Sequence, residues 1–166
     1  NSLQFTCGAK CAIEWAKKDI KVKKKKEDKA FKAETRRLKE TIKKKSKWLE
    51  EAQIEFNKFI RTRDEGDACI SCGRRTGCKV NAGHYKSVGA YPELRFDERN
   101  VNLQCEYCNC HKSGNATEYR VRLIQKIGER EVEWLEGPHE PAKYTIEEIK
   151  EIKRVYREKT KQLINV

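Results

Sequence analysis

Residues 69–72 read Cys-Ile-Ser-Cys, and residues 105–108 read Cys-Glu-Tyr-Cys. Two such pairs supply four thiolates, the ligand set of a closed tetrahedral zinc site. The expected ligands of this structural Zn²⁺ are Cys69, Cys72, Cys105 and Cys108. A site of this kind has no open position for catalysis, so its expected role is to hold the fold together; the alternative is a reduced, metal-free cluster. Because 32 residues separate the pairs, we expect further structure to fold between them.

The other four of the eight cysteines lie outside these pairs. No secretion signal accompanies them, so metal ligation is favoured over disulfides. Cys7 and Cys11 form half of a zinc motif within residues 1–12; either its other half was removed or the two are free thiols. Cys78 and Cys110 are candidates for small buried side chains or for substitute ligands.

Basic residues are concentrated in one segment of the 166-residue chain. The net charge is +12, and residues 17–47 hold sixteen Lys or Arg against five Asp or Glu. Such a segment would repel itself without anions, so it indicates a polyanionic partner; the alternative is a solvated face. The residues expected to contact DNA phosphates are Lys23, Lys24, Lys25, Lys26, Arg36 and Arg37. Such contacts are blind to sequence and weaken steeply with salt.

Helical periodicity surrounds the cysteine-rich part. Residues 13–60 contain neither Pro nor Gly and are predicted to form one long basic helix. From Phe31 to Phe59 apolar side chains recur at alternating steps of three and four residues, the spacing of a coiled coil. The part before Phe31 is expected to be disordered, or to become helical only when it binds DNA. Residues 117–166 are predicted to be helical, with a break at Gly128 and a loop at 137–143. No apolar run is long enough to span a membrane.

Helix starts are predicted at two polar residues in the C-terminal region. Thr145 with Glu148 forms the pattern of a capping box, in which each side chain bonds the other residue's backbone. Asn115 with Glu118 has the same spacing and predicts a second capped start. Both helices should then carry apolar residues on one face towards a core.

Between the two cysteine pairs the order of polar residues is Gly83-His84, then Asn100, and then, after Cys-x2-Cys, Asn109-x-His111-Lys112. The string N-V-N-L-Q-C-E-Y-C-N-C-H-K resembles the end of the HNH nuclease motif, with Val in place of the family's Leu. This resemblance implies an α+β, mostly helical protein. Its zinc-clamped treble-clef, ββα-metal core would occupy residues 61–116, between the long N-terminal helix and the C-terminal helices.

From about Trp48 onward the chain also resembles the NinG (Rap) recombination proteins of lambdoid phages. The shared strings are C-I-S-C-G, A-G-H-Y, L-R-F-x-E-R-N, C-N-x-H-K-S-G-N, Y-R-V and W/Y-T-I-E-E. The resemblance implies a phage protein in the cytoplasm of its bacterial host. Its implied substrates are branched recombination intermediates such as D-loops and Holliday junctions. It also makes Cys7 and Cys11 look like the end of the family's N-terminal zinc motif.

Hydrolysis of a phosphodiester needs an activated water and neutralisation of charge on the phosphate. By motif position His84 is the candidate general base, since a neutral imidazole accepts a proton near pH 7. Asn100 is the candidate to hold that imidazole in the required tautomer. The candidate ligands of a catalytic Mg²⁺ or Mn²⁺ are Asn109 and His111, and Lys112 is a candidate phosphate contact.

Each of these candidates also has a purely structural interpretation. Asn100 could cap a turn, and Asn109 could cap the helix that follows the second cysteine pair. His111 could be a zinc ligand or a surface residue. Arg95 and Arg99 could contact phosphate, or could pair with nearby acids.

The sequence departs from the HNH pattern at Gly83, where many HNH enzymes carry a metal-binding carboxylate. Asp97 and Glu98 are the nearby acids that could replace it. Three function classes therefore stay open: a metal-dependent, structure-selective DNA endonuclease, a zinc-containing DNA-binding protein without catalysis, and a coiled-coil adaptor. The two helical seams could pack on each other, or could form a homodimer that suits a two-fold symmetric junction.

Overall fold

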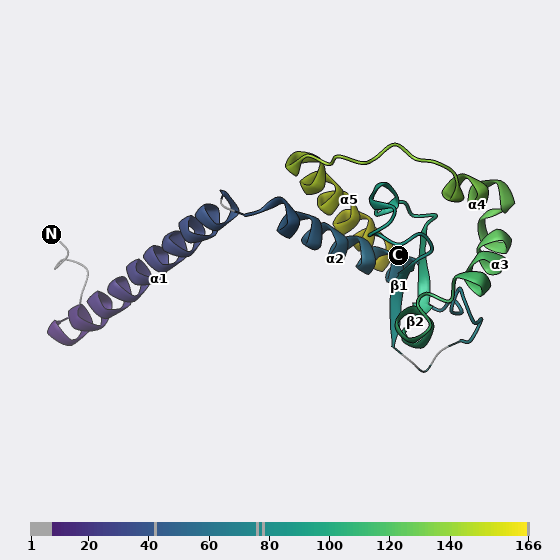
Figure 1. Cartoon of the computed structure of the whole chain (residues 1–166). Coiled ribbons are helices and arrows are strands. Elements are labelled where there is room, and N and C mark those ends of the chain that lie inside the picture. The colour runs from purple at the N-terminus through teal and green to yellow at the C-terminus, as the bar shows by residue number, and fades with distance from the viewer. Residues whose placement is uncertain (1–7, 42, 76, 78, 166) are drawn as a thin grey trace. The chain divides into compact units, whose positions relative to one another are not determined.

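The computed structural model describes residues 8–41, 43–75, 77 and 79–165. The chain divides into two compact units, Asn1–Lys44 and Lys45–Val166, and each is described by itself. The described elements, in chain order, are α1 (Ala9–Thr41), α2 (Lys45–Arg63), β1 (Val80–His84), the 3-10 turn η2 (Pro92–Leu94), β2 (Val101–Cys105), the π-helical turn η3 (Tyr107–His111), α3 (Ala116–Ile127), α4 (Glu129–Glu136) and α5 (Ile146–Ile164) (Figure 1). The predicted α+β class, mostly helical with a small sheet, is confirmed.

The prediction of one continuous helix over residues 13–60 is wrong. α1 ends at Thr41, residues 43 and 44 are not helical, and α2 begins at Lys45. The Thr41 hydroxyl donates a 2.7 Å hydrogen bond to the Leu38 carbonyl, and such a bond competes with the helical one. Three consecutive lysines, residues 43–45, follow this point in the chain, and their like charges repel one another. The helix therefore ends between the two units.

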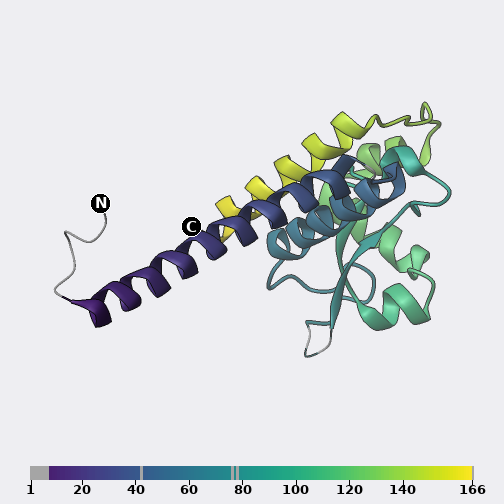
Figure 2. The same cartoon turned by 90° about the vertical axis from the view of Figure 1, so that its left-hand side faces the viewer.

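The first hydrophobic core lies between α2 and α5, which run side by side (Figures 1 and 2). Phe56 is fully buried, and its ring meets the ring of Tyr156 edge to face at a centroid distance of 4.7 Å. The other buried members of this core are Trp48, Ala52, Phe59, Ile60, Phe96, Val101 and Ile149. The α2 half of the predicted coiled-coil seam thus packs within the chain, on α5, which is one of the two expected arrangements.

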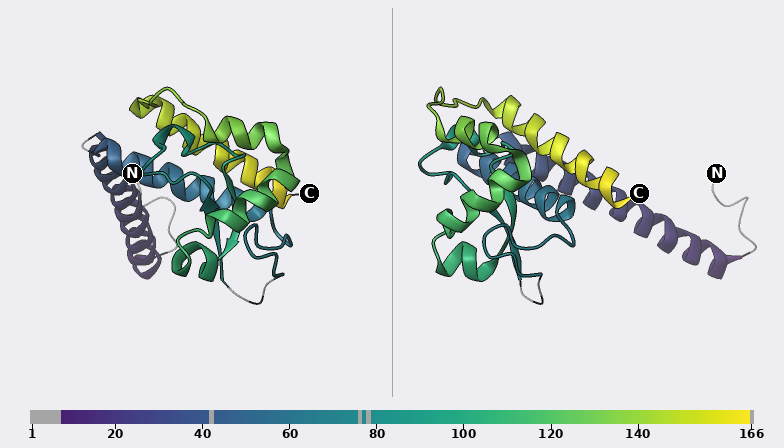
Figure 3. Two further views of the ribbon diagram at one scale, coloured as in Figure 1. Left: turned by 45° about the vertical axis from the view of Figure 1, so that its right-hand side comes forward. Right: turned by 90° about the vertical axis from the view of Figure 1, so that its right-hand side faces the viewer.

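β1 and β2 form a two-stranded antiparallel sheet beside α2 (Figure 3). In its register Val80 pairs with Cys105, and His84 pairs with Val101. All five residues of β2 are buried. The register places His84 at one end of the sheet and Cys105 at the other, so the sheet carries a candidate catalytic residue and a candidate zinc ligand on opposite ends.

A second hydrophobic core joins α3 and α4 to the loops around the sheet. Its buried residues are Ile70, Leu94, Tyr119, Leu123, Val132 and Leu135. The predicted break at Gly128 is confirmed: its φ is +89° and it separates α3 from α4. A positive φ is readily adopted by glycine, which has no Cβ to clash.

One predicted capping box is confirmed, whereas at Asn115 the predicted helix start is right but the capping box is absent. The Thr145 hydroxyl accepts a bond from the Glu148 backbone, and the Glu148 carboxylate accepts one from the Thr145 backbone. Asn115 precedes α3 but has a left-handed backbone, with φ +47°, and its side chain makes no capping bond. Its amide nitrogen instead lies 3.9 Å from the Cys108 sulfur. Of the helices that the structure describes, none is both long and apolar enough to cross a membrane.

Candidate functional site

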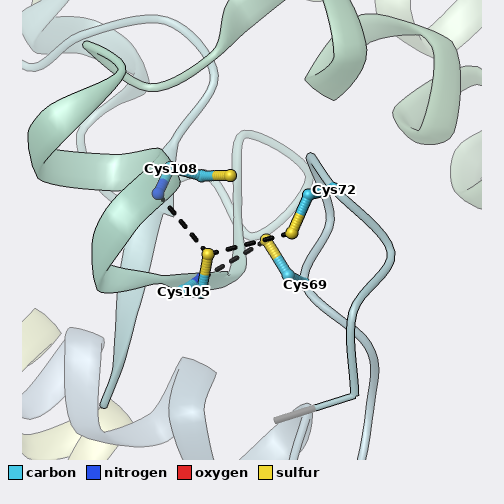
Figure 4. Close-up of side chains that lie close together, drawn as sticks. All are labelled: Cys69, Cys72, Cys105 and Cys108. Atoms are coloured by element: carbon cyan, nitrogen blue, oxygen red, sulfur yellow. Dashed lines mark hydrogen bonds between the residues drawn. The ribbon is translucent and has the colours of Figure 1, made fainter. Parts of the chain in front are cut away.

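The four predicted zinc ligands come together at one point (Figure 4). Their sulfur atoms all lie within 4.8 Å of one another, and the sulfurs of Cys72 and Cys105 are 3.9 Å apart. A tetrahedral Zn²⁺ with Zn–S bonds of about 2.3 Å needs sulfurs roughly 3.8 Å apart. The cluster therefore fits a zinc ion held by Cys69 and Cys72 from the loop after α2, Cys105 from β2, and Cys108 from η3.

Backbone N–H groups point at these sulfurs. The amide of Cys105 donates to the Cys69 sulfur at 3.3 Å, and the amide of Cys108 donates to the Cys105 sulfur at 3.4 Å. Burial raises the pKa of the Cys69 thiol, but backbone hydrogen bonds from Cys72, Cys105 and Ser71 outweigh it and lower the pKa to about 7. Amide donors of this kind favour the thiolate, the form that binds metal. At Cys105 and Cys108 burial and the neighbouring cysteines outweigh such bonds and raise the pKa.

The remaining cysteines do not join the cluster among the described residues. Cys110 is exposed on η3, and its sulfur lies 3.7 Å from the amide nitrogen of Asn81. Cys11 is exposed on α1. Cys7 and Cys78 lie outside the described residues, so the proposed N-terminal zinc motif stays a prediction.

His84 and Asn109 line one cavity of about 300 Å³. His84 is the last residue of β1, whereas Asn109 lies on the turn η3 that follows β2. The two line the same cavity although 24 residues separate them in sequence and β2 ends, before η3, at the opposite end of the sheet from His84. The other lining residues are Ala82, Ser87, Val88, Ser113 and Gly114. Ser87 and Ser113 add hydroxyl groups that sequence reasoning did not assign; both sit in strings, Y-K-S and H-K-S-G, next to the motif residues.

The imidazole of His84 is held by a backbone carbonyl. Its Nε2 lies 3.1 Å from the carbonyl oxygen of Arg95. A carbonyl oxygen can only accept, so Nε2 carries the proton and Nδ1 keeps a free lone pair. Burial lowers the pKa of His84 from 6.5, and the charge of Arg95 adds to this, against the effect of the carbonyl bond. The residue is thus a neutral, oriented imidazole near pH 7.

Asn100 was expected to hold the His84 imidazole, but its side-chain hydrogen bonds go to other groups. The Asn100 side chain is fully buried and accepts from the Lys86 backbone N–H at 2.8 Å. It donates to the carbonyls of Lys86 and Leu94 at 3.0 and 3.1 Å. Because all these bonds go to the connection between the strands, Asn100 positions the chain around His84, and the Arg95 carbonyl holds the imidazole itself.

Gly83 has no room for the carboxylate found in many HNH enzymes. A Cβ atom added there would lie 2.9 Å from the Cβ and Cδ atoms of Gln104, and closer still to its Oε1. Gln104 is fully buried, and its Nε2 donates to Ser71 and to the Gly114 carbonyl, each at 2.6 Å. The Tyr119 hydroxyl donates to the Gly83 carbonyl at 2.9 Å. The glycine is therefore required by the packing of β1 on β2 and α3.

The two acids considered as replacements are engaged elsewhere. Asp97 binds Arg99, with an Arg99 Nη2 to carboxylate distance of 2.6 Å, and Glu98 binds Lys159 at 2.5 Å. Arg99 also pairs with Glu131, so it is less available for phosphate. None of these side chains is among the described residues that line the His84 cavity.

Two further candidates lie outside this cavity. His111 is exposed, and its ring centroid lies 5.9 Å from that of Tyr107, with the two rings tilted by 35°. The Lys112 ammonium also sits over Tyr107, 5.5 Å from the ring centre. Neither is among the described lining residues of the His84 cavity. The structure therefore brings His84 and Asn109 together, but not His111.

The donor set of the cavity does not match a resident Mg²⁺ or Mn²⁺. The described lining offers an imidazole, one amide and two hydroxyls, all of them neutral. Hard divalent cations are held by oxygen ligands that usually include carboxylates. Among the described residues, the group suited to hold a metal is the four-cysteine cluster.

Comparison with known proteins places these features in a family. The family described as "Bacteriophage Lambda NinG protein" matches residues 1–165. Protein ninG of Escherichia phage 933W and that of Escherichia phage lambda are each 48% identical to this chain over 124 residues, and that of Salmonella phage P22 is 48% identical over 122. These matches cover 74–75% of this chain and 60–62% of those proteins, so the chain spans about three fifths of their length. No solved structure matches significantly.

Proposed function

We propose that this chain, which belongs to the bacteriophage lambda NinG family, is a zinc-containing, HNH-type DNA endonuclease with His84 as its general base. The observation that supports this proposal most directly is the hydrogen bonding and protonation of His84, in the cavity that it shares with Asn109. Its Nε2 is bonded to the Arg95 carbonyl, and burial lowers its pKa. A neutral imidazole with one free nitrogen suits proton abstraction near pH 7.

In the proposed reaction, Nδ1 of His84 takes a proton from a water molecule whose oxygen attacks the phosphorus. The bond from phosphorus to the leaving oxygen breaks, and that oxygen takes a proton from solvent. The Asn109 amide can donate to a phosphate oxygen from the same cavity. A divalent cation would neutralise charge on the phosphate. Because the described lining of the cavity carries no carboxylate, none of its residues is assigned as a ligand of that ion.

The proposed substrates are D-loops and Holliday junctions, in the cytoplasm of the bacterial host. Support for branched DNA comes from the resemblance to phage recombination proteins, and support for DNA as a polyanion comes from the net charge of +12. The four-cysteine cluster would hold a structural zinc that keeps β2 and η3 in place beside the cavity.

A second candidate function is DNA binding without catalysis. The observation that favours it is the neutral cavity, in which the packing of Gln104 against Gly83 leaves no space for the acid of other HNH enzymes. Under this alternative, His84 would serve only to join the end of β1 to the Arg95 carbonyl.

Cleavage of matched, labelled DNAs tests the proposal. Linear duplex, single strand, D-loop and four-way junction would each be incubated with Mg²⁺, Mn²⁺ or EDTA. The proteins would be the full chain, His84→Gln and, as a matched control, His139→Gln, whose histidine lies near Trp134 after α4. We expect cutting of the branched forms, reduced about 10²- to 10⁴-fold by His84→Gln and unchanged by His139→Gln.

DNA affinity and zinc content of each variant are the controls. If both are retained while His84→Gln stops cleavage, the loss is chemical and not structural. Tight binding to all four DNAs with no cutting under any ion condition would contradict the nuclease and support the second candidate.

The pH dependence gives an independent check of His84. A general base must be unprotonated, and burial lowers the pKa of His84 below 6.5. We therefore expect the midpoint of the fall in cleavage rate to lie below pH 6.5, with zinc content measured at each pH. A midpoint above pH 6.5 would contradict a buried, neutral His84 base.

A further inference from the structure

The charge of α1 lies on one face of the helix. Its 33 residues hold thirteen basic and six acidic side chains, and none is buried. At 3.6 residues per turn, nine of the basic side chains fall on about one third of the circumference: Lys10, Lys17, Lys18, Lys21, Lys25, Lys29, Lys32, Arg36 and Lys39. We call this the basic face. Of the six acidic residues of α1, only Glu14 and Asp28 share it.

The rest of α1 is electrically balanced. Outside the basic face lie four basic residues, Lys23, Lys24, Lys26 and Arg37, and four acidic ones, Asp19, Glu27, Glu34 and Glu40. Two of these basic groups are ion-paired: Lys23 with Asp19 at 2.8 Å, and Arg37 with Glu34 at 3.7 Å. The whole excess charge of the helix therefore belongs to the basic face.

Among the described residues, none of the nine basic side chains on this face forms an ion pair of this kind. Lys18, Lys21, Lys25, Lys29, Lys32 and Arg36 follow one another at steps of three or four residues, which places like charges next to each other along the helix. Such pairs destabilise a helix unless anions lie between them. A row of negative groups relieves this repulsion along its whole length.

The length of the row favours duplex DNA as that polyanion. From Lys10 to Lys39 the basic face runs roughly 44 Å at 1.5 Å per residue, longer than one turn of duplex, about 34 Å. An anionic membrane suits the helix less well, because interfacial helices need a continuous apolar face. Here Lys24 and Glu27 interrupt the exposed apolar residues between Ile20 and Phe31.

We infer that the basic face of α1 is a contact surface for the phosphate backbone of duplex DNA. This inference rests on the proposed function in one respect, that DNA is the substrate. It also revises the residues expected from the sequence. Lys25 and Arg36 stay in the contact surface, whereas the other four expected contacts, Lys23, Lys24, Lys26 and Arg37, lie outside it.

Two variants of the full chain with equal charge change test the surface. The first carries Lys25→Gln, Lys29→Gln, Lys32→Gln and Arg36→Gln, on the basic face. The matched control carries Lys23→Gln, Lys24→Gln, Lys26→Gln and Arg37→Gln. Affinity for a labelled linear duplex would be measured by fluorescence anisotropy over a series of salt concentrations, with helix content checked by circular dichroism.

Each phosphate contact contributes about 0.9 to the slope of log affinity against log salt concentration. We expect the basic-face variant to lose roughly 3 to 4 of that slope, and the control variant to lose less than about 1. Equal losses in both variants would overturn the inference, because diffuse attraction does not depend on the face. An unchanged slope in both would overturn it as well.

Two further outcomes separate this inference from the nuclease proposal. Normal duplex binding by the unmodified chain without cleavage, with the slope lost only in the basic-face variant, would support the surface while the nuclease fails. The protein could instead bind phosphatidylglycerol vesicles and not duplex DNA, and lose that binding on the basic-face substitutions. This result would overturn DNA as the partner.

Discussion

At the scale of single residues, Gly83 decides which atoms the candidate cavity can offer. Its neighbour across the sheet, Gln104, fills the space that a side chain would take. Gln104 is itself tied to Ser71 and to the Gly114 carbonyl, so it has little freedom to move aside. The absence of an acid before His84 is thus a consequence of packing, and a carboxylate cannot be restored there without cost to stability.

Gly83→Ala is expected to destabilise the protein by about 1–3 kcal/mol, the usual cost of overpacking a filled core. Gly89→Ala is the matched control, because an added Cβ at Gly89 meets nothing within 4 Å. Urea unfolding of both variants measures the difference. Combining Gly83→Ala with Gln104→Ala should recover part of the loss, since it removes the nearest clashing atom. A Gly83→Ala variant as stable as Gly89→Ala would contradict the packing account.

At the scale of elements, α1 and α2 show that the same apolar spacing can have two outcomes. On α2 it is buried: Phe56 and Ala52 are inaccessible against α5. On α1 it is exposed, with Phe31 and Leu38 at 75% and 57%. Spacing determines which residues share a helix face, but burial requires a partner, and within the unit Lys45–Val166 α5 provides one for α2. The homodimer stays a prediction.

Phe56→Ala should cost about 3–5 kcal/mol of unfolding free energy, because it leaves a cavity between α2 and α5. Ile54→Ala, two residues away on the same helix, removes a side chain that is 58% exposed and should cost less than about 0.5 kcal/mol. Chemical denaturation monitored by tryptophan fluorescence gives both values. Equal effects would mean that this core does not carry the stability of the unit.

At the scale of the whole molecule, the four-cysteine cluster connects segments of the unit Lys45–Val166 that are distant in sequence. It ties the loop after α2 to the end of β2 and to η3. A two-stranded sheet is only marginally stable by itself in water, and this one carries His84 of the cavity and one of the four ligands, Cys105. Metal at this point would hold the candidate active site in shape without taking part in the reaction.

Loss of one ligand should therefore release zinc and destabilise the unit Lys45–Val166. Cys69→Ser is expected to lose the bound ion, about one per chain, and to lower the unfolding temperature sharply. Cys110→Ser, which alters an exposed thiol outside the cluster, should keep both. Elemental analysis and thermal unfolding, with and without a chelator, measure the two effects. A full chain that contains no zinc and is insensitive to the chelator would contradict a structural metal site.

Local signals in the sequence determined much of this protein. The spacing of the two cysteine pairs identified the residues of the cluster, the pattern at Thr145 located the start of α5, and Gly128 located the break between α3 and α4, because each depends on residues close together in the chain. The basic segment was also evident. That its excess positive charge lies on one face appears only once α1 is treated as a helix.

Contacts between distant segments were decided by the tertiary structure alone. The role of Asn100 in holding the connection between the strands, the Arg95 carbonyl on His84, and the Gln104 side chain against Gly83 are not encoded in any spacing. Each depends on which strand pairs with which and on what fills the space between them. Sequence periodicity reports the faces of single elements, whereas hydrogen-bond partners and free volume are properties of the packed molecule.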